Sequence, residues 1–308
     1  MSPIAGSLLG AVFGPGFFAS SPVHSALIVG GVAAVVSGVV GTITVMRGQS
    51  FAGHSLGDIG TAGGSAAVLV GTSPLLGFVA MNVLAAGAME TIGIRRPRGR
   101  DLATGIVLGA ALGLAALFLY LDTTFTSTTG ATVNVLFGSI FTLSASSLPL
   151  VGAFSAIALT LVLVLYRPLV LSSLDTDLAA ARGVPVRLVG VGYLLALALA
   201  VSLSAVSIGA ILSTALLIGP SATALRLTKR TGLAMALAGL IGIVATWLGV
   251  LLSYDSYYWP PAHHGWPASF FVVSLVLVFY LLASAAPQRD GPGLRAGHGR
   301  HVGHERAE

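Results

Sequence analysis

Two ionisable residues interrupt an otherwise apolar and glycine-rich stretch, FAGHSLGDIGTAGG, at residues 51–64. His54 and Asp58 are four positions apart, so on a helix they share one face and lie about 6 Å apart along the axis. An imidazole and a carboxylate are ligands suited to borderline divalent cations such as zinc, manganese or ferrous iron. The pattern therefore allows three uses: a metal-binding pair, a proton relay, or a hydrogen-bonded pair that only holds helices together.

The composition of the chain places this pair inside a membrane. Of the 308 residues, 55% are hydrophobic and only 8% are charged, whereas an ordinary soluble domain has about a quarter charged residues. The mean hydropathy is +0.95. The apolar stretches are about 20 residues long, which is typical of transmembrane helices and not of barrel strands. The sequence predicts an all-α, polytopic membrane protein, in which ionisable groups usually face the bundle interior or a water-filled path.

The apolar segments predict about eight to nine transmembrane helices, because the division near residues 204–206 is weakly marked. We expect one transmembrane permease domain over residues 25–286. Residues 1–24 would form an extracytoplasmic segment that lacks the basic region of a signal peptide and contains a short interfacial or re-entrant run. The segments fall at about 25–46, 52–71, 74–94, 101–121, 147–166, 186–204, 206–225, 232–253 and 268–286.

The basic residues predict the orientation of the chain. If the N-terminus is outside and nine spans alternate, the inside connections and the tail hold all 15 Lys and Arg residues. This distribution obeys the positive-inside rule and predicts a plasma (inner) membrane protein with a cytoplasmic C-terminus. It also explains the pI near 10.0 without a nucleic-acid partner. The inside residues are Arg47, Arg95, Arg96, Arg98, Arg100, Arg167, Arg182, Arg187, Arg226, Lys229, Arg230, Arg289, Arg295, Arg300 and Arg306.

The glycines, the absence of cysteine and the absence of an ATP-binding motif limit the functions that the chain can have. The helix that carries the polar pair also carries Gly53, Gly57, Gly60 and Gly64, which we expect to let neighbouring helices approach closely. The chain has no cysteine, so it has neither a disulfide nor a thiolate metal site. It also has no Walker A pattern, so it does not bind ATP in the P-loop manner.

The inside segment SLDTDLAAARGVP predicts a short cytoplasmic helix. Ser173 is expected to cap it, Asp175 and Asp177 would lie in its first turn, Arg182 in its last turn, and Gly183 would end it. Such a helix can be a plain connector, or it can dock in a groove of a separate ATPase subunit. The segment alone favours the connector, because most such short helices only satisfy their own backbone.

Four stretches, taken together and in order, resemble the permease subunits of the zinc/manganese/iron class of ABC importers. The resemblance covers most of residues 25–286. The chain differs from the family at one point. Family members commonly have aspartate before histidine in the second span, whereas this chain has His54 before Asp58. This reversal leaves the choice of metal open. The stretches are VVGTITVMRGQSFAGHSLGDIG (39–60), LFGSIFTLS (136–144), DTDLAAARGVPV (175–186) and AVSIGAILSTALLIGPSATALRLTKR (205–230).

The resemblance implies a transport subunit that is not an enzyme. Family members work as a permease dimer with two ATPase subunits and an extracytoplasmic metal-binding lipoprotein. The chain itself would then have no catalytic residue and no bound cofactor apart from the transported divalent metal ion. By resemblance, His54 and Asp58 would lie on the ion path. The contact with the ATPase would involve Asp175, Asp177, Leu178, Arg182 and Gly183.

Pro220 and five histidines are further candidates for functional roles. Pro220, near the inside end of its span, either acts as a pivot for alternating access or only ends the helix. His263 and His264 are either an outside relay for metal or ordinary loop residues. The tail 287–308 is predicted to be disordered. Its three histidines either bind metal weakly or have no role; they are His298, His301 and His304.

Two other functions compete with metal import. A permease for a bulkier ligand, such as a siderophore or cobalamin, would need a wide and mostly neutral path, and His54 and Asp58 would then only pack helices. A stand-alone proton-coupled carrier would use the pair as a relay and would need no ATPase. An inverted repeat would favour the carrier, and the sequence shows no convincing one.

Overall fold

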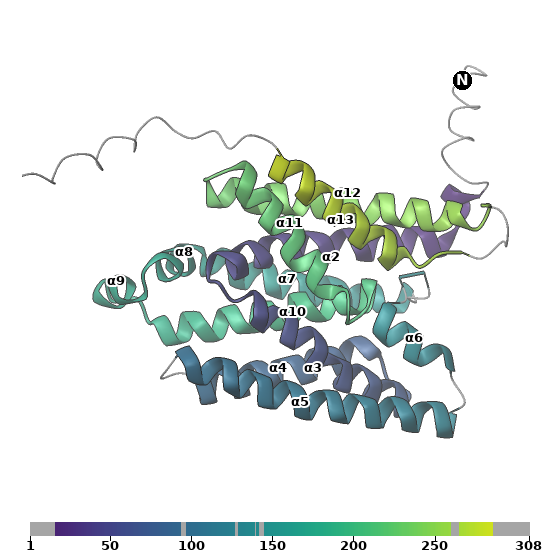
Figure 1. Cartoon of the computed structure of the whole chain (residues 1–308), viewed down its shortest axis with the longest axis horizontal. Coiled ribbons are helices and arrows are strands. Elements are labelled where there is room, and N and C mark those ends of the chain that lie inside the picture. The colour runs from purple at the N-terminus through teal and green to yellow at the C-terminus, as the bar shows by residue number, and fades with distance from the viewer. Residues whose placement is uncertain are drawn as a thin grey trace, which may run out of the picture.

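The computed structural model describes residues 16–93, 97–126, 129–138, 140–141, 145–259 and 265–285, and the regular elements within these ranges are helical. Figure 1 shows that most helices lie lengthwise beside one another. The main helices are α2 (Ser21–Met46), α3 (Ser50–Leu69), α4 (Pro74–Gly93), α5 (Pro97–Leu121), α6 (Thr129–Phe137), α7 (Leu148–Val164), α8 (Tyr166–Leu174), α9 (Thr176–Ala181), α10 (Val186–Ile208), α11 (Ser213–Leu227), α12 (Thr231–Ser256) and α13 (Ala268–Ala285). Short turns are η1 (Phe17–Ala19), η2 (Asp122–Thr126) and η3 (Ala145–Ser147).

The predicted all-α membrane fold is confirmed, and each predicted apolar segment overlaps a helix. Within the described residues, five helices are long and apolar enough to cross a membrane, namely α2, the stretch Gly105–Phe125 of α5 and η2, α10, α12 and α13. A sixth span results if α7 and α8, which are bent by 63° at Leu165, are counted together. The expected eight to nine spans are reached only by including α3, α4 and α11, which are shorter or less apolar.

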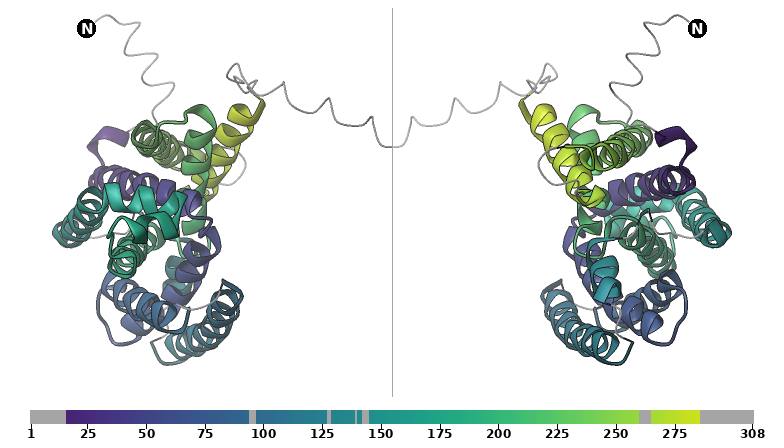
Figure 2. Two further views of the ribbon diagram at one scale, coloured as in Figure 1. Left: turned by 90° about the vertical axis from the view of Figure 1, so that its left-hand side faces the viewer. Right: turned by 90° about the vertical axis from the view of Figure 1, so that its right-hand side faces the viewer.

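Helices α2 and α10 form the centre of the bundle. In the most apolar 18-residue stretch of α10, 78% of the stretch is buried inside the protein, whereas in the α5 span only 17% is buried. Helix α10 is therefore surrounded by protein, and α5 is peripheral. In Figure 1, α12 and α13 lie on one side of these central helices and α3, α4 and α5 on the other. The end-on views of Figure 2 show the same order. The peripheral apolar faces are therefore available to lipid.

Small residues allow the central helices to approach closely. A Cβ atom at Gly41 would overlap the carbonyl oxygen of Leu217, so α2 and α11 touch backbone to backbone. Ser37 and Ser204 are hydrogen-bonded at 2.6 Å between α2 and α10, and both are fully buried. Such contacts replace the hydrophobic driving force that is missing between helices in lipid.

The glycines of α3 pack as predicted. A Cβ at Gly53 would lie 2.8 Å from Leu217, and one at Gly60 would lie 2.8 Å from Phe78. Next to Gly60, Asn82 of α4 donates from Nδ2 to Ser202 Oγ of α10 at 2.9 Å. Hydrogen bonds of this kind join helices where no water is present. The start and middle of α3 are thus fixed against α4, α10 and α11.

A break in the backbone separates α10 from α11. Gly209 has φ 95°, which favours glycine, and the backbone N–H groups of Ala210 and Ile211 donate to the carbonyls of Val135 (3.2 Å) and Leu136 (3.4 Å). These carbonyls belong to the last turn of α6, so the short helix covers the break. Non-helical backbone at membrane depth is stable only when it is satisfied in this way by protein.

Two boundaries differ from those expected from sequence. The division between spans was expected near residues 204–206, but α10 continues to Ile208. Its serines do not interrupt it, because Ser204 and Ser207 donate to the carbonyls of Ala200 and Leu203 within the helix. The stretch VLFGSIFTLS (135–144) predicts a short helix, whereas α6 begins at Thr129 and ends at Phe137, just before Gly138.

Candidate metal-binding site

The polar pair of α3 lies on one face of the helix, as its spacing predicts. His54 Nε2 is 3.5 Å from Asp58 Oδ2, and the side chains are 47% and 20% exposed. Both residues belong to one helix, so their direct contact does not lock two helices together. The predicted lock between helices is therefore not made by this contact, and the pair remains accessible from one face of the bundle.

Thr214 connects the pair to the start of α11. His54 Nδ1 is hydrogen-bonded to Thr214 Oγ1 at 3.0 Å. When Nδ1–H is the donor, the lone pair of Nε2 is on the side that faces Asp58. The hydroxyl therefore orients the imidazole, and it lies directly after the break between α10 and α11. The pair is positioned by three helices, because a Cβ on Gly57 of α3 would lie 2.7 Å from the Ser213 hydroxyl of α11 and 3.8 Å from Val201 of α10.

The distance between the two ligand atoms fits coordination of one ion. Nitrogen and oxygen ligands about 2.1 Å from a common metal are about 3.0–3.4 Å apart, depending on the angle at the ion. The observed 3.5 Å between Nε2 and Oδ2 requires little adjustment. Among the described residues, no group of three or more His, Cys, Asp or Glu side chains could hold a metal. A cation here would have two such ligands from one chain, with water or another group completing its shell.

Sequence reasoning missed Thr214, although it found the pair. The two predicted residues are close because a helix brings positions i and i+4 together. Thr214 is 160 positions away from His54, and its approach depends on the place where α10 ends. The sequence signal was the glycine in SIGAILST, which marks the break and puts Ser213 and Thr214 at the beginning of the next helix.

The predicted short helix is present as α9, but its capping residue is Asp175 and not Ser173. Asp175 has extended backbone angles, and its Oδ1 accepts from the N–H groups of Asp177 and Leu178 at 2.9 Å. Ser173 still belongs to α8, where its hydroxyl donates to the carbonyl of Leu169 at 2.6 Å. The turn comes later than expected because α8 continues through Leu174.

The residues assigned to the ATPase contact lie together on an exposed arm. Asp175, Asp177, Leu178, Arg182 and Gly183 are all exposed, and the apolar side chain of Leu178 is 43% exposed. Gly183 has φ 78°, which suits a glycine that ends a helix. In Figure 1 this arm lies at the opposite end of the bundle from α6.

Pro220 lies inside α11, and the alternative that it ends the helix is wrong. The helix continues for seven residues to Leu227. Proline has no N–H, so the carbonyl one turn earlier loses its usual donor. Ser221 bridges the neighbouring helix at this point, because its hydroxyl lies within hydrogen-bonding distance of the carbonyls of Leu217 (2.9 Å) and Gly38 (3.2 Å). Its use as a pivot stays a prediction.

The remaining histidine candidates are not placed by the structure. His263 and His264 fall in 260–264, and the three tail histidines fall in 286–308, both outside the described residues. The weak metal-binding roles of these histidines therefore stay predictions; the tail residues are His298, His301 and His304.

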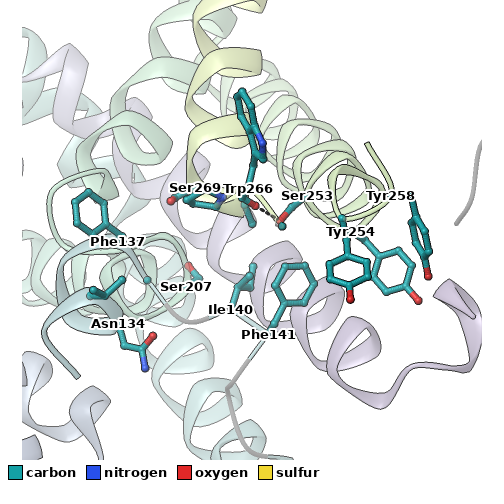
Figure 3. A pocket seen from close by; sticks show the side chains of 16 residues that line it. Asn134, Phe137, Ile140, Phe141, Ser207, Ser253, Tyr254, Tyr258, Trp266 and Ser269 are labelled. Carbon is teal, nitrogen blue, oxygen red and sulfur yellow. Dashed lines mark hydrogen bonds between the residues drawn. The ribbon is translucent and has the colours of Figure 1, made fainter. Parts of the chain in front are cut away.

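A separate cavity of about 820 Å³ lies between α6, α12 and α13. Figure 3 shows aromatic side chains around it, including Phe137, Phe141, Tyr254 and Trp266. None of the described residues that line it carries a carboxylate or an imidazole. The described part of its lining therefore offers no ligands of a metal site, unlike the face of α3 that bears His54.

The fold and the site define the class of protein: a multi-pass helical membrane protein with an accessible polar pair among its core helices. Comparison with known proteins identifies the family. A profile of the ABC 3 transport family matches residues 21–286. The chain belongs to the ABC 3 transport family, and it is a permease subunit of an ABC transporter. The stand-alone carrier is not compatible with this membership.

Curated relatives are similar over most of their length. The manganese transport system membrane protein MntC of Halalkalibacterium halodurans is 29% identical over 236 residues, which cover 75% of this chain and 77% of the relative. MntC of Listeria monocytogenes is 27% identical over 243 residues, which cover 79% and 85%.

Solved structures show the same fold. A chain of PsaBC from Streptococcus pneumoniae, solved in complex with Fab, aligns with a TM-score of 0.75 and 24% identity over 89% of this chain and 95% of that one. An ABC transporter described as of the metal-chelate type, in an inward-facing conformation, aligns with a TM-score of 0.70 and 15% identity over 87% of each chain. The polytopic helical fold expected from the sequence is thus confirmed.

Proposed function

We propose that this permease moves a divalent transition metal ion inward, and that the ion is manganese. The observation that carries the proposal is the His54–Asp58 pair, whose ligand atoms are 3.5 Å apart on an accessible face of α3. An imidazole and a carboxylate suit manganese, zinc and ferrous iron alike. Manganese is chosen because MntC of two organisms is named for manganese transport.

The energy for transport would come from ATP hydrolysis in a partner subunit. The exposed arm α8–α9 offers Leu178 and the acidic first turn of α9 to a groove of that ATPase. Two permease chains would form the path, and an extracytoplasmic metal-binding lipoprotein would deliver the ion to the outside. ATP binding would favour one gate arrangement over the other, which is a population shift between two states. Pro220 would be the pivot of α11 in this change.

The experiment is metal uptake by the complete transporter in proteoliposomes, with its ATPase and binding protein present. His54→Ala, Asp58→Ala and the double variant are compared with wild type for manganese, zinc and ferrous iron; Pro220→Ala joins the series to test the pivot. Each single variant should lower manganese uptake by about tenfold or more, because a ligand is at least as costly to lose as its outer-shell partner. His24→Ala, which changes an exposed histidine at the start of α2, should have no effect.

The outcomes separate the competing functions. Loss of manganese uptake, with the ATPase still bound and the permease still folded, places the pair on the ion path. Normal uptake in the double variant would show that the pair only packs helices. Preferential uptake of zinc or iron would show that manganese is not the substrate, but the assignment of the pair to the ion path would stand. Uptake of a metal chelate, but not of the free ion, would assign the chain to the bulkier-ligand class.

A further inference from the structure

Arg47, in the turn between α2 and α3, contacts two helices that are distant in sequence. Its Nη1 donates to Ser172 Oγ of α8 at 3.1 Å. Its guanidinium carbon lies 4.9 Å from the centroid of the Tyr193 ring of α10, a cation–π distance. One side chain therefore joins the α2–α3 turn to both α8 and α10.

On one side, Arg47 is connected to the cytoplasmic arm. Ser172 is 4% exposed and lies three residues before Asp175, which caps α9. One turn earlier in α8, Leu169 is fully buried. This end of α8 is therefore packed against the bundle while α9 projects from it. A force applied to α9 acts on the part of α8 that contacts Arg47.

On the other side, Arg47 is connected to the helix that carries the polar pair. Tyr193 donates from its hydroxyl to Thr44 Oγ1 of α2 at 3.1 Å, and both residues are buried. The methyl group of Thr44 is 3.7 Å from the position of a Cβ on Gly53. Gly53 directly precedes His54. The contacts thus form one continuous path from α8 to the beginning of α3.

We propose that Arg47 is the positioning residue that transmits movement of the α8–α9 arm to the α2–α3 turn, and so to His54. The inference rests on the proposed function, because it assumes that a partner moves α9. Arginine suits the role, since its planar guanidinium can stack on a ring and donate a hydrogen bond at the same time. A lysine keeps the charge but cannot make both contacts in this geometry.

Arg226 provides a matched control. It lies in the last turn of α11, where its guanidinium carbon is 4.9 Å from the ring centroid of Tyr280 and its Nη2 donates to the Tyr280 hydroxyl at 3.0 Å. This pair makes the same cation–π contact as Arg47 and Tyr193, but it joins α11 to α13 instead of joining the α2–α3 turn to α8 and α10. Arg47→Lys and Arg226→Lys therefore make the same chemical change at two places, of which only one is on the proposed path.

The first test measures manganese uptake and ATP hydrolysis together in the reconstituted transporter. Arg47→Lys should lower the metal moved per ATP roughly 2- to 30-fold, the range of a coupling change of this kind. ATP hydrolysis and binding of the ATPase should persist. Tyr193→Phe, which keeps the ring and removes the bond to Thr44, should have a smaller effect in the same direction. A normal ratio in Arg47→Lys would overturn the proposal, as would an equal loss in Arg226→Lys.

A second measurement does not depend on the identity of the substrate. Because the chain has no cysteine, spin labels can be attached through Ala180→Cys in α9 and Phe51→Cys at the start of α3, both exposed positions. In the assembled transporter, we expect ATP to change the spectra of both labels in the parent. In Arg47→Lys, we expect ATP to change only the spectrum of the α9 label. If ATP changes the spectrum of the label at position 51 in Arg47→Lys as much as in the parent, the linkage is overturned. Absence of manganese uptake, with this linkage intact, would overturn the proposed substrate alone.

Discussion

At the scale of single residues, the site depends on how the His54 imidazole is held. Its Nδ1 contacts Thr214 while its Nε2 faces Asp58. A partner on the second nitrogen fixes the ring orientation and tautomer of a metal-binding histidine. The threonine hydroxyl is therefore part of the proposed site, although it would not need to touch the ion.

We predict that Thr214→Val weakens manganese uptake while Thr214→Ser preserves it. Valine has nearly the shape of threonine but no hydroxyl, so the imidazole loses its fixed orientation. Loss of such a partner typically costs about 10- to 100-fold in metal affinity. The measurement is the manganese concentration that gives half-maximal uptake. Equal values for the valine and serine variants would show that Thr214 only fills space.

The residues of the site were predictable to different degrees. His54 and Asp58 were predictable as a pair because both belong to one helix, whose geometry follows from spacing alone. Thr214 was not, because its position depends on three-dimensional contacts: the break after Gly209, and the α6 carbonyls that satisfy it. A contact between residues 160 positions apart leaves no trace in local spacing.

At the scale of elements, α9 combines a local capping signal with an exposed surface, which we propose contacts the ATPase. Asp175 caps the helix through two backbone N–H groups, and the rest of the six-residue helix is mostly exposed. A helix this short has little stability of its own. Its shape therefore depends strongly on the cap, and so does any groove contact that requires this shape.

We predict that Asp175→Ala weakens binding of the ATPase subunit while Asp175→Asn largely preserves it. Alanine removes the cap, at a cost of about 0.5–2 kcal/mol, whereas asparagine keeps a capping oxygen and removes only the charge. The measurement is the amount of ATPase that copurifies with the permease over a range of salt concentrations. Weak binding in both variants would mean that the charge of Asp175, and not the helix cap, is what the partner requires.

The elements themselves were predictable from hydropathy, but their ends were not. Each apolar segment became a helix because about 20 apolar residues can satisfy their backbone in lipid only as a helix. The 63° bend between α7 and α8 was not foreseen, because the residues after the predicted span 147–166 were interpreted as a connection and not as a further helix. The cap at Asp175 was misplaced by two residues for the same reason: α8 extends the apolar helix beyond the predicted span.

At the scale of the whole molecule, contacts agree with the distribution of charge. Arg47 reaches Ser172, which is close in sequence to the arm with Arg182, so two segments predicted to be inside lie at the same end of the bundle. Helix α6 belongs to the connection after the segment 101–121, which the alternation of spans places outside, and it lies at the other end (Figure 1). The charge pattern and the contacts are independent of each other, and together they favour a cytoplasmic α9.

This orientation gives a prediction that the native chain is well suited to test, because it has no cysteine. Thr72→Cys in the connection between α3 and α4 and Thr176→Cys at the start of α9 are conservative changes at exposed positions. A membrane-impermeant maleimide added to intact cells should label position 72, and it should label position 176 only after the membrane is opened. The cysteine-free parent gives the background. Labelling in the reverse order would place the basic connections outside. That result would contradict the orientation, and with it the assignment of α9 to a cytoplasmic ATPase, because ATP is available to such a subunit only on the inside.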